Sequence, residues 1–359
     1  MRVCYFGPYS PGCPRNRVII EGLRKNGVEV VECNSQSANR ISDYLKLLTV
    51  HQTLKYDVII LGARGIYYGQ PLMPFIKKMT SKPVVFDAML TLYETCVIDR
   101  KTVSSNSIRA GMLYLLDYAA LNGANLILSD TNAHSEFYSN FYNVASSKFG
   151  RVLVGSDDEI FFPRQPNKVN DSFLVVFWGN YIPLQGVKYI IEAAKLLESN
   201  KDIKFELRGF GQTYNETFEL WRKLRLENIT FITQRIDYAK LPNYIAKADI
   251  CLGIFGETEK AMRVIPNKAV ETLAMRKPLI TGNSPAAREL LINMENSLLV
   301  PMANSKILAD AILTLKEDKN LRAKIAENGY QLFRKKLTPK IIGRRLKLAL
   351  TDLVKKKHY

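Results

Sequence analysis

Strand-like and helix-like segments alternate along the whole chain. Short runs such as 84–86 and 173–178 are apolar throughout, which is typical of parallel strands buried on both faces of a sheet. Segments with apolar residues at helical spacing, such as 15–26 and 185–199, separate most of these runs. Regular alternation of strands and helices predicts parallel sheets wrapped by helices, so we expect an α/β fold.

The same patterns predict the bounds of each element. The predicted strands are 2–6, 28–32, 57–61, 83–86, 125–129 and 151–154, then 173–178, 204–208, 229–232, 250–254 and 278–281. The predicted helices are 15–26, 41–50, 72–79, 108–122 and 131–141, then 185–199, 213–225, 238–247, 268–275 and 285–290, with a terminal helix over 338–354.

A length of 359 residues is typical of two domains, each able to bury its own core. The polar, proline-bearing stretch 163–171 is the expected linker. We therefore predict two doubly wound, Rossmann-like domains at 1–165 and 166–335, facing each other across a cleft, with a basic helical segment at 336–359. Ligands of such sheets bind beyond the carboxyl ends of the strands, which makes the cleft the expected site.

Positive charge is concentrated at the end of the chain. The net charge is +17, and the segment 319–359 holds thirteen basic and two acidic residues. Such a charge usually suggests nucleic acid as a partner, but here the body of the protein is only mildly basic. The terminal helix has two interpretations. In the first, its basic side docks on anionic lipid headgroups. In the second, the basic side is only solvated and the apolar stripe packs on the protein itself.

The sequence gives little reason to expect a metal site or a disulfide framework. The five cysteines form no CxxC pair, and there are only three histidines, so we expect neither a disulfide framework nor a metal site. No window of about 18 apolar residues occurs, and the first residues lack a secretory signal pattern. We expect a cytoplasmic protein.

Glycine-rich turns follow several predicted strands. The first runs from Gly7 into a helix that begins near Arg15 and Asn16. A helix N-terminus there would attract a phosphate or a polar acceptor, although a turn without a ligand fits equally well. In the second half, two more turns could cradle a diphosphate, or be ordinary tight turns. Their candidate residues are Gly179, Asn180, Gln185 and Gly186, and Arg208, Gly209 and Gly211.

The segment 249–281 carries the most specific pattern. A strand leads into a charged glycine loop, and a helix begins at Pro266-Asn267-Lys268. We expect Asn267 to cap this helix and Lys268 to offer a point charge to a phosphate. Glu271, one turn further, is placed to accept hydrogen bonds from vicinal sugar hydroxyls, or it only compensates the helix dipole.

These motifs resemble glycosyltransferase family 4 and its relatives, enzymes of the GT-B fold. The likeness rests on the 179–186 loop, the 207–211 strand end and Glu271-x-x-Ala274-x-x-x-Pro278, with 154–163 in the first half. It looks closest to a prokaryotic branch with an Ile-Pro-Asn-Lys motif at 265–268. The resemblance implies a donor domain at 166–335, an acceptor-side domain at 1–165, and a terminal helix that packs back on the latter.

The resemblance also implies an activity. A hexosyl group would pass from a UDP- or GDP-linked donor to a hydroxyl of a glycan or lipid-linked acceptor, with retained configuration and without a metal. The nucleotide-sugar is then a co-substrate, and no cofactor is expected. The terminal charge would lie beside the acceptor face, which favours a membrane surface over nucleic acid, and thus a peripheral protein at the inner face of the cell membrane, in polysaccharide biosynthesis.

This chain departs from the family pattern at several charged positions. Asn180 and Gln185 stand where the family commonly has Arg and Lys, and Arg263 stands where the first of two paired glutamates is expected. Lys268 and Arg263 would then meet the diphosphate, with Arg208 a weaker candidate. On the acceptor side Asp87 or Asp99 would contact the hydroxyl. The same departures support an alternative, a catalytically inactive glycosyltransferase-like subunit that binds or regulates a partner.

Overall fold

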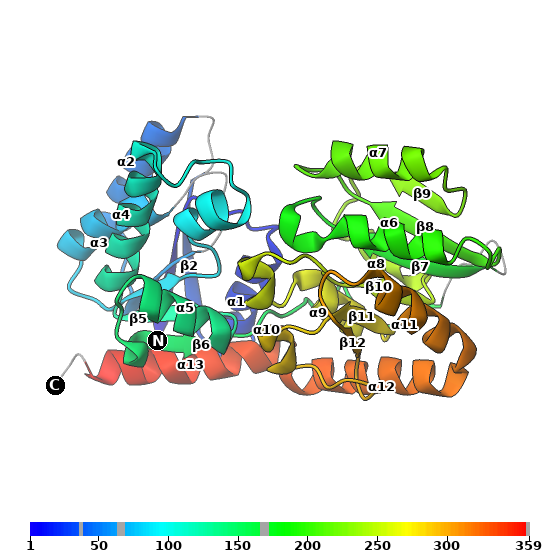
Figure 1. The fold of residues 1–359 in the computed structure, drawn as a ribbon. Coiled ribbons are helices and arrows are strands. Elements are labelled where there is room, and N and C mark those ends of the chain that lie inside the picture. Colours follow the sequence, from blue (N-terminus) through cyan, green and yellow to red (C-terminus); the bar gives the residue numbers. More distant parts are fainter. Residues whose placement is uncertain (36–38, 63–68, 166–171, 357–359) are drawn as a thin grey trace. The chain divides into compact units, whose positions relative to one another are not determined.

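The computed structural model describes residues 1–35, 39–62, 69–165 and 172–356. Contacts divide the chain into two compact units, each with its own sheet (Figure 1). Unit 1 comprises Met1–Asp157 and Leu337–Tyr359, and unit 2 comprises Asp158–Lys336. Part of the expected linker, residues 166–171, lies outside the described residues. Lys357, near the end of the basic segment, lies outside them too.

Unit 1 is built on a six-stranded parallel sheet in the order β2-β1-β3-β4-β5-β6. Its strands are β1 (Arg2–Gly7), β2 (Glu29–Asn34), β3 (Val58–Leu61), β4 (Val84–Asp87), β5 (Leu126–Ser129) and β6 (Phe149–Arg151). Strands β3 and β4 are buried along their whole length, because helices cover both faces of this sheet.

The helices of unit 1 form two layers. They are α1 (Pro14–Arg24), α2 (Arg40–Gln52), α3 (Met73–Met79), α4 (Ile108–Gly123), α5 (Asn132–Phe141) and α13 (Pro339–Lys356), with short turns at Gln70–Leu72 and Ser146–Lys148 and a π-helical turn at Glu94–Asp99. One apolar core lies between the sheet and α2–α5. A second core joins the other face of the sheet to α1 and α13.

Unit 2 repeats the architecture with the strand order β12-β11-β10-β7-β8-β9. Its strands are β7 (Phe173–Trp178), β8 (Ile203–Arg208), β9 (Ile229–Ile232), β10 (Ile250–Leu252), β11 (Leu279–Gly282) and β12 (Leu298–Val300). Its helices are α6 (Val187–Leu196), α7 (Tyr214–Leu224), α8 (Leu241–Ala246), α9 (Asn267–Ala274), α10 (Pro285–Arg288), α11 (Ser305–Glu317) and α12 (Lys319–Lys336), with short turns at Pro183–Gln185 and Glu259–Met262.

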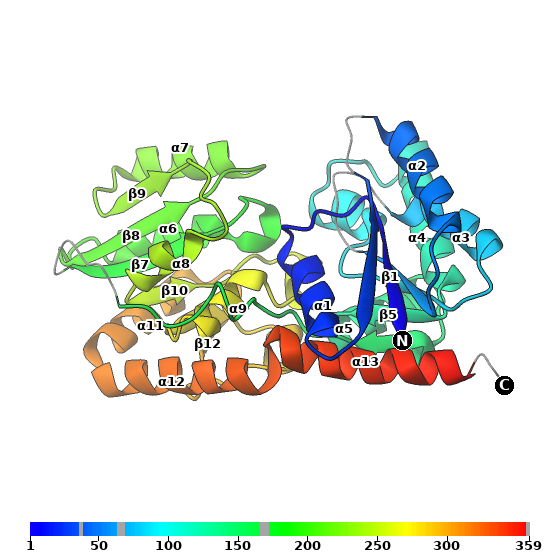
Figure 2. The ribbon, with the colours of Figure 1, turned by 180° about the vertical axis from the view of Figure 1, so that it is seen from behind.

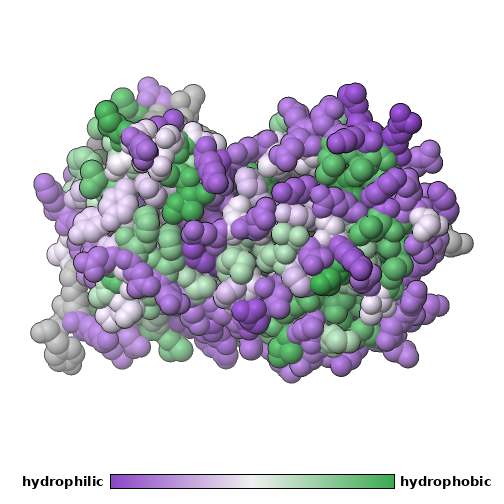
Figure 3. Space-filling view, in the orientation of Figure 1, coloured by the Kyte–Doolittle hydropathy of each residue, from purple (hydrophilic) through white to green (hydrophobic). Residues whose placement is uncertain are grey.

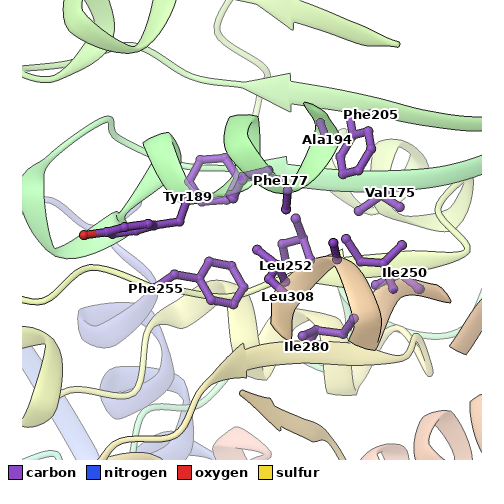
Figure 4. Packing of buried hydrophobic residues seen from close by; sticks show 14 of the residues in the cluster. Val175, Phe177, Tyr189, Ala194, Phe205, Ile250, Leu252, Phe255, Ile280 and Leu308 are labelled. Atoms are coloured by element: carbon purple, nitrogen blue, oxygen red, sulfur yellow. The ribbon is translucent and has the colours of Figure 1, made fainter. Parts of the chain in front are cut away.

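The main core of unit 2 reaches the loops that follow its strands. Val175 and Phe177 of β7 pack with Leu252 of β10 and Ile280 of β11, beneath α6 and α11 (Figure 4). Phe255, just beyond β10, is part of the same cluster and is 1% exposed. The core therefore anchors the loop after β10 as well as the strand.

The predicted α/β class with two doubly wound sheets is confirmed, with local corrections. Strand β6 is Phe149–Arg151 rather than 151–154, because Val152–Val154 continue as a buried segment beyond the ladder. The sequence patterns did not predict β12, α11 or α12. Strand β12 has three residues, too few for an alternating pattern to stand out.

Helix α13 packs on α1, and Figure 2 shows the two in contact. Its apolar stripe, Ile342, Leu346 and Leu350, is buried in the core that it shares with α1. This arrangement agrees with the interpretation in which the stripe packs on the protein itself, so that α13 turns mainly charged side chains to solvent. The helices approach closely because Gly22 and Gly343 face each other: a Cβ on Gly343 would overlap the Gly22 carbonyl group.

We predict that Gly343→Ala destabilises unit 1 by about 1–3 kcal/mol, because the added methyl group forces α13 away from α1. Gly111→Ala on α4 is the matched control. Apart from its chain neighbours and the backbone of its own helix, no atom of the described residues lies within 4 Å of the added Cβ, so this variant should gain roughly 0.5–1 kcal/mol from helix propensity. Urea unfolding followed by circular dichroism measures both. Equal stability of the two variants would contradict the close-packed crossing.

Candidate functional site

Three loops of unit 2 meet at one edge of its sheet. They follow β7, β8 and β10, which are neighbours in the order β10-β7-β8. Because these strands are parallel, their carboxyl ends lie at the same edge, where open α/β sheets bind ligands. The loop after β7 also contacts the loop after β10: the N–H of Phe255 donates to the Gln185 carbonyl at 3.1 Å, and that of Gly256 donates to Leu184 at 3.2 Å.

Gly186 makes this contact possible. Its φ is +64°, and a Cβ there would overlap the backbone of Phe255 and Gly256. A left-handed conformation with a backbone against one side favours glycine strongly. Beside Gly186 lies a pocket of about 180 Å³, lined also by Lys188, Thr213 and Glu257. The glycine predicted from the sequence therefore shapes the edge of a hollow.

Lys268 is buried where the loops meet. Its Nζ lies 2.5 Å from Oε1 of Gln185 and 3.5 Å from the centroid of the Phe177 ring, and the residue is 5% exposed. A Cβ on Gly179 would lie 2.9 Å from the same Nζ. Burial lowers the pKa of Lys268 well below its ordinary value, while Glu271 acts in the opposite direction. Such a group favours an arriving anion, which would restore its positive charge.

Glu271 lies one turn further along α9. Trp178, the last residue of β7, donates its Nε1–H to Oε2 of Glu271 at 2.9 Å. Burial raises the pKa of Glu271 to about 7, and Trp178, Lys268 and Tyr238 act in the opposite direction. The carboxyl group is therefore poised to change charge near neutral pH.

The N-terminus of α9 differs from the prediction in one respect. Pro266, in an extended conformation, is the N-cap, and Asn267 is the first residue of the helix. The prediction that Asn267 caps the helix is therefore wrong, because Pro266 occupies the capping position. The Oδ1 of Asn267 is buried without a hydrogen-bond partner in the described part of the chain. The free N–H groups of the first turn belong to the same edge of the sheet.

The remaining predicted donor-site residues take different places. Arg263 follows the short turn after Thr258 and pairs with exposed Glu259 at 3.4 Å. Arg208 donates to the Gln234 carbonyl at 2.8 Å and lies over the Tyr244 ring. Asn180 is exposed. Gly209 and Gly211 pack against the backbone of the loop after β7.

The predicted acceptor-side residues belong to unit 1. Gly7 ends β1, and the buried Arg15 guanidinium pairs with Asp87 at 2.9 Å. Both carboxylate oxygens of Asp87 accept from this guanidinium, so the pair ties α1 to the end of β4. Asn16 accepts from the Tyr5 hydroxyl at 2.8 Å, and Asp99 is 2% exposed. Unit 1 thus uses Arg15, Asp87 and Asn16 for its own internal contacts.

Two features of the structure were not predicted. One is Trp178 as partner of Glu271, a contact between positions 93 residues apart that no local pattern signals. The other is a buried cluster in unit 1, in which His134 lies 2.7 Å from Asp130 and 3.2 Å from Glu94. Burial alone would lower the pKa of His134, but the two carboxylates raise it to about 9. With all three side chains buried, this cluster ties α5 to the π-helical turn.

Known proteins similar to this chain are glycosyltransferases. Residues 158–332, nearly all of unit 2, match the family model described as glycosyl transferases group 1. The chain is 26% identical over 170 residues to the alpha-D-kanosaminyltransferase of Streptomyces kanamyceticus, a match covering 47% of this chain and 43% of that one. It is 24% identical over 265 residues to the capsular polysaccharide biosynthesis glycosyltransferase CapM of Staphylococcus aureus, covering 68% and 66%. The chain thus spans less than two thirds of these relatives.

A solved structure extends the likeness to both units. HepE of Anabaena, in complex with UDP and glucose, superimposes with a TM-score of 0.75 at 15% identity, covering 98% of this chain and 100% of that one. At this identity the match concerns the fold, which is that of the GT-B enzymes. The chain therefore has the two-domain GT-B fold, and residues 158–332 match the model of the group 1 glycosyl transferases.

Proposed function

We propose that unit 2 binds the nucleoside diphosphate of a sugar donor and that the protein transfers the sugar to a hydroxyl of a glycan or lipid-linked acceptor. The observation that carries this proposal is the placement of Lys268 and Glu271 on the first turns of one helix, behind a glycine loop. HepE, of the same fold, is described in complex with UDP and glucose. The relatives named above are sugar transferases by name.

The site suits the leaving group of such a reaction. Transfer breaks the bond between the anomeric carbon and a diphosphate oxygen, so negative charge develops on the diphosphate. The Lys268 ammonium and the free N–H groups of α9 would stabilise that charge in a preorganised way. Arg263 would add a second cation once it leaves Glu259. Glu271, when ionised, would accept hydrogen bonds from the vicinal hydroxyls of the ribose.

The rest of the reaction is proposed by analogy with the family. The acceptor oxygen forms the new bond to the anomeric carbon with retained configuration, and its proton passes to the released phosphate. No metal takes part, since protein cations meet the charge of the diphosphate. Polysaccharide biosynthesis is a fitting role, because CapM is described as a capsular polysaccharide enzyme.

We also propose that the protein works at the inner face of the cell membrane. None of the helices that the structure describes is long and apolar enough to span a bilayer. Helix α13 turns Lys340, Arg344 and Arg345 to solvent, and near its end Lys355 and Lys356. Such side chains attract anionic lipid headgroups by about 1 kcal/mol each near the surface.

Nucleotide binding tests the donor site directly. At 100 times its dissociation constant UDP or GDP should stabilise the wild-type protein by about 2.7 kcal/mol, read as a rise in melting temperature. Lys268→Met should weaken the binding by at least about tenfold, since it removes the charged partner of the phosphates. The exposed Lys223→Met on α7 is the control and should bind like wild type. Binding without any transfer to acceptors would favour the inactive-subunit alternative, and no binding of either nucleotide would refute the donor site.

Trp178→Phe tests the electrostatic role of the Trp178–Glu271 contact. The indole N–H favours the ionised carboxylate, so its loss should raise the pKa of Glu271 above about 7. Ionised Glu271 accepts the ribose hydroxyls, and therefore UDP affinity should fall as the pH drops through this pKa. Titration of UDP from acidic to alkaline pH should show this fall at higher pH in the variant than in wild type. Uniformly weaker binding with an unchanged midpoint would show that Trp178 only fills space.

Charge reversal at the end of α13 tests the membrane proposal. Lys355→Glu with Lys356→Glu should reduce sedimentation with vesicles that contain phosphatidylglycerol, because two attractive charges become repulsive. The control variant, Lys319→Glu with Lys324→Glu on α12, also reverses two exposed lysines but lies in unit 2. UDP affinity should not change in either variant. Equal vesicle binding by the two would mean that the terminal charge is merely solvated.

A further inference from the structure

A pocket of about 420 Å³ opens at the amino edge of the unit 1 sheet. Its walls come from the ends of α2 and α3 and from the segments that lead into β3 and β4, and they include His51, Tyr56 and Thr80. The predicted acceptor-side residue Asp87 lies at the opposite end of β4. Hydrophilic side chains, in purple, are spread over unit 1 in Figure 3, so they do not by themselves mark a site. A buried histidine distinguishes this pocket from the rest of the surface.

His51 lies in the last turn of α2 and is 3% exposed. Its Nε2 pairs with the Tyr56 hydroxyl, and its ring packs edge-on against Phe6. Its Nδ1 is buried without a hydrogen-bond partner in the described part of the chain. Burial lowers the pKa of His51, so the imidazole is neutral at physiological pH and carries one N–H. Most buried polar atoms in native proteins have a partner, so the free nitrogen requires an explanation.

The neighbouring hydrogen bonds decide which nitrogen of His51 carries the proton. The backbone N–H of Lys82 donates to Oγ1 of Thr80 at 3.0 Å. Burial raises the pKa of Tyr56 and a hydrogen bond with Thr80 lowers it, as expected when Thr80 donates to the phenol oxygen. The Tyr56 hydroxyl then donates to Nε2 of His51. This chain of donors runs in one direction and leaves the imidazole proton on Nδ1. His51 thus offers a buried N–H that has no acceptor among the described residues.

The charged residues that line the pocket are basic. They are Lys55 and Lys82, and Ser81 adds a hydroxyl group to the same wall. No acidic residue is among the described residues that line the pocket. Asp57, the acid next to this region in the chain, accepts from the backbone N–H of Arg2 at 2.7 Å. A ligand of the pocket must therefore bring hydrogen-bond acceptors and negative charge.

The two lysines have a second interpretation, in which they compensate the carbonyl groups at the ends of α2 and α3. Some of these carbonyl groups already have donors. That of His51 accepts from the N–H of Leu54 at 3.2 Å, and that of Ile76 accepts from the N–H of Thr80 at 3.0 Å. Compensation of helix ends also leaves the buried N–H of His51 unexplained, whereas an anionic ligand accounts for the N–H and the lysines together.

We propose that this pocket binds the phosphate group of a small molecule. A phosphate oxygen would accept the Nδ1–H of His51, and the ammonium groups of Lys55 and Lys82 would balance the negative charge. A volume of about 420 Å³ is typical of small-ligand pockets and leaves room for an organic group on the phosphate. The proposal stands apart from sugar transfer, because it uses no residue of unit 2 and none at the carboxyl edge of unit 1.

Calorimetric titration of the full chain tests the site. Inorganic phosphate and glycerol 3-phosphate are titrated with and without saturating UDP, and we expect binding that UDP does not prevent. Tighter binding of the ester would identify an organic phosphate as the ligand, and equal binding the free ion. Lys55→Gln with Lys82→Gln should weaken the binding by at least about tenfold, because two charged donors are lost. The control, Lys46→Gln with Lys78→Gln, removes two exposed lysines of α2 and α3 outside the pocket and should bind like wild type.

Nuclear magnetic resonance of ¹⁵N-labelled histidine rings tests the role of His51. Tyr56→Phe removes the hydroxyl that contacts this ring and so identifies its resonances. In the wild type we expect the proton on Nδ1 and a change of the Nδ1 shift when phosphate is added. The proposal is overturned if neither phosphate compound binds in the presence of UDP, or if the pocket variant binds as wild type does. It is equally overturned if the resonances of His51 do not respond at saturating phosphate, since the lysines would then only compensate the helix ends.

Discussion

The parallel pairing of β10, β7 and β8 is the constraint on which the proposed donor site depends. Parallel strands end at one edge, so residues far apart in the chain, such as Trp178 and Glu271, meet there without any local signal. The buried core beneath, from Phe177 to Phe255, holds the ends of these strands in place. Gly186 then lets the loop after β7 lie on the backbone of Gly256. The site is thus a consequence of strand order, completed by one glycine.

Burial gives this site its chemistry. Lys268 and Glu271 are both shielded from water, and burial disfavours the charged form of each. Each side chain lessens that effect on the other, and Trp178 supports the carboxylate. A diphosphate and a ribose would supply what is missing, an anion beside Lys268 and hydroxyl donors beside Glu271. Burying two charged groups destabilises the free protein, and a ligand that carries both partners would relieve this destabilisation. The site would therefore favour such a ligand.

The sequence could predict the elements of this fold but only part of its contacts. Fully apolar runs such as 173–178 and helical spacing over 338–354 lie within one or two residues of β7 and α13, because each pattern is local. Local patterns, a glycine loop and a helix start, also indicate Lys268, Glu271 and Gly186 as site residues, and their role stays a prediction. The contacts of Glu271 with Trp178 and of Lys268 with Gln185 depend on strand order. A local stretch of sequence does not contain that order. The cap of α9 was misassigned because Pro266 and Asn267 both suit a helix start.

The structure, as well as the concentration of basic residues at the C-terminus, decides how charge is distributed over the surface. In unit 1, acids such as Asp87, Glu94 and Asp117 are buried as partners of internal donors, so they add little negative charge to the surface. Arg15, the partner of Asp87, is buried as well, so this pair leaves the charge of the surface unchanged, whereas Glu94 and Asp117 remove acidic groups from the surface. On α4 the same separation leaves apolar side chains outside and a carboxylate inside, the reverse of an ordinary soluble helix. Since burying a carboxylate is costly without fixed donors, this inversion requires the backbone N–H groups of Leu92 and Tyr93 to hold Asp117 in place.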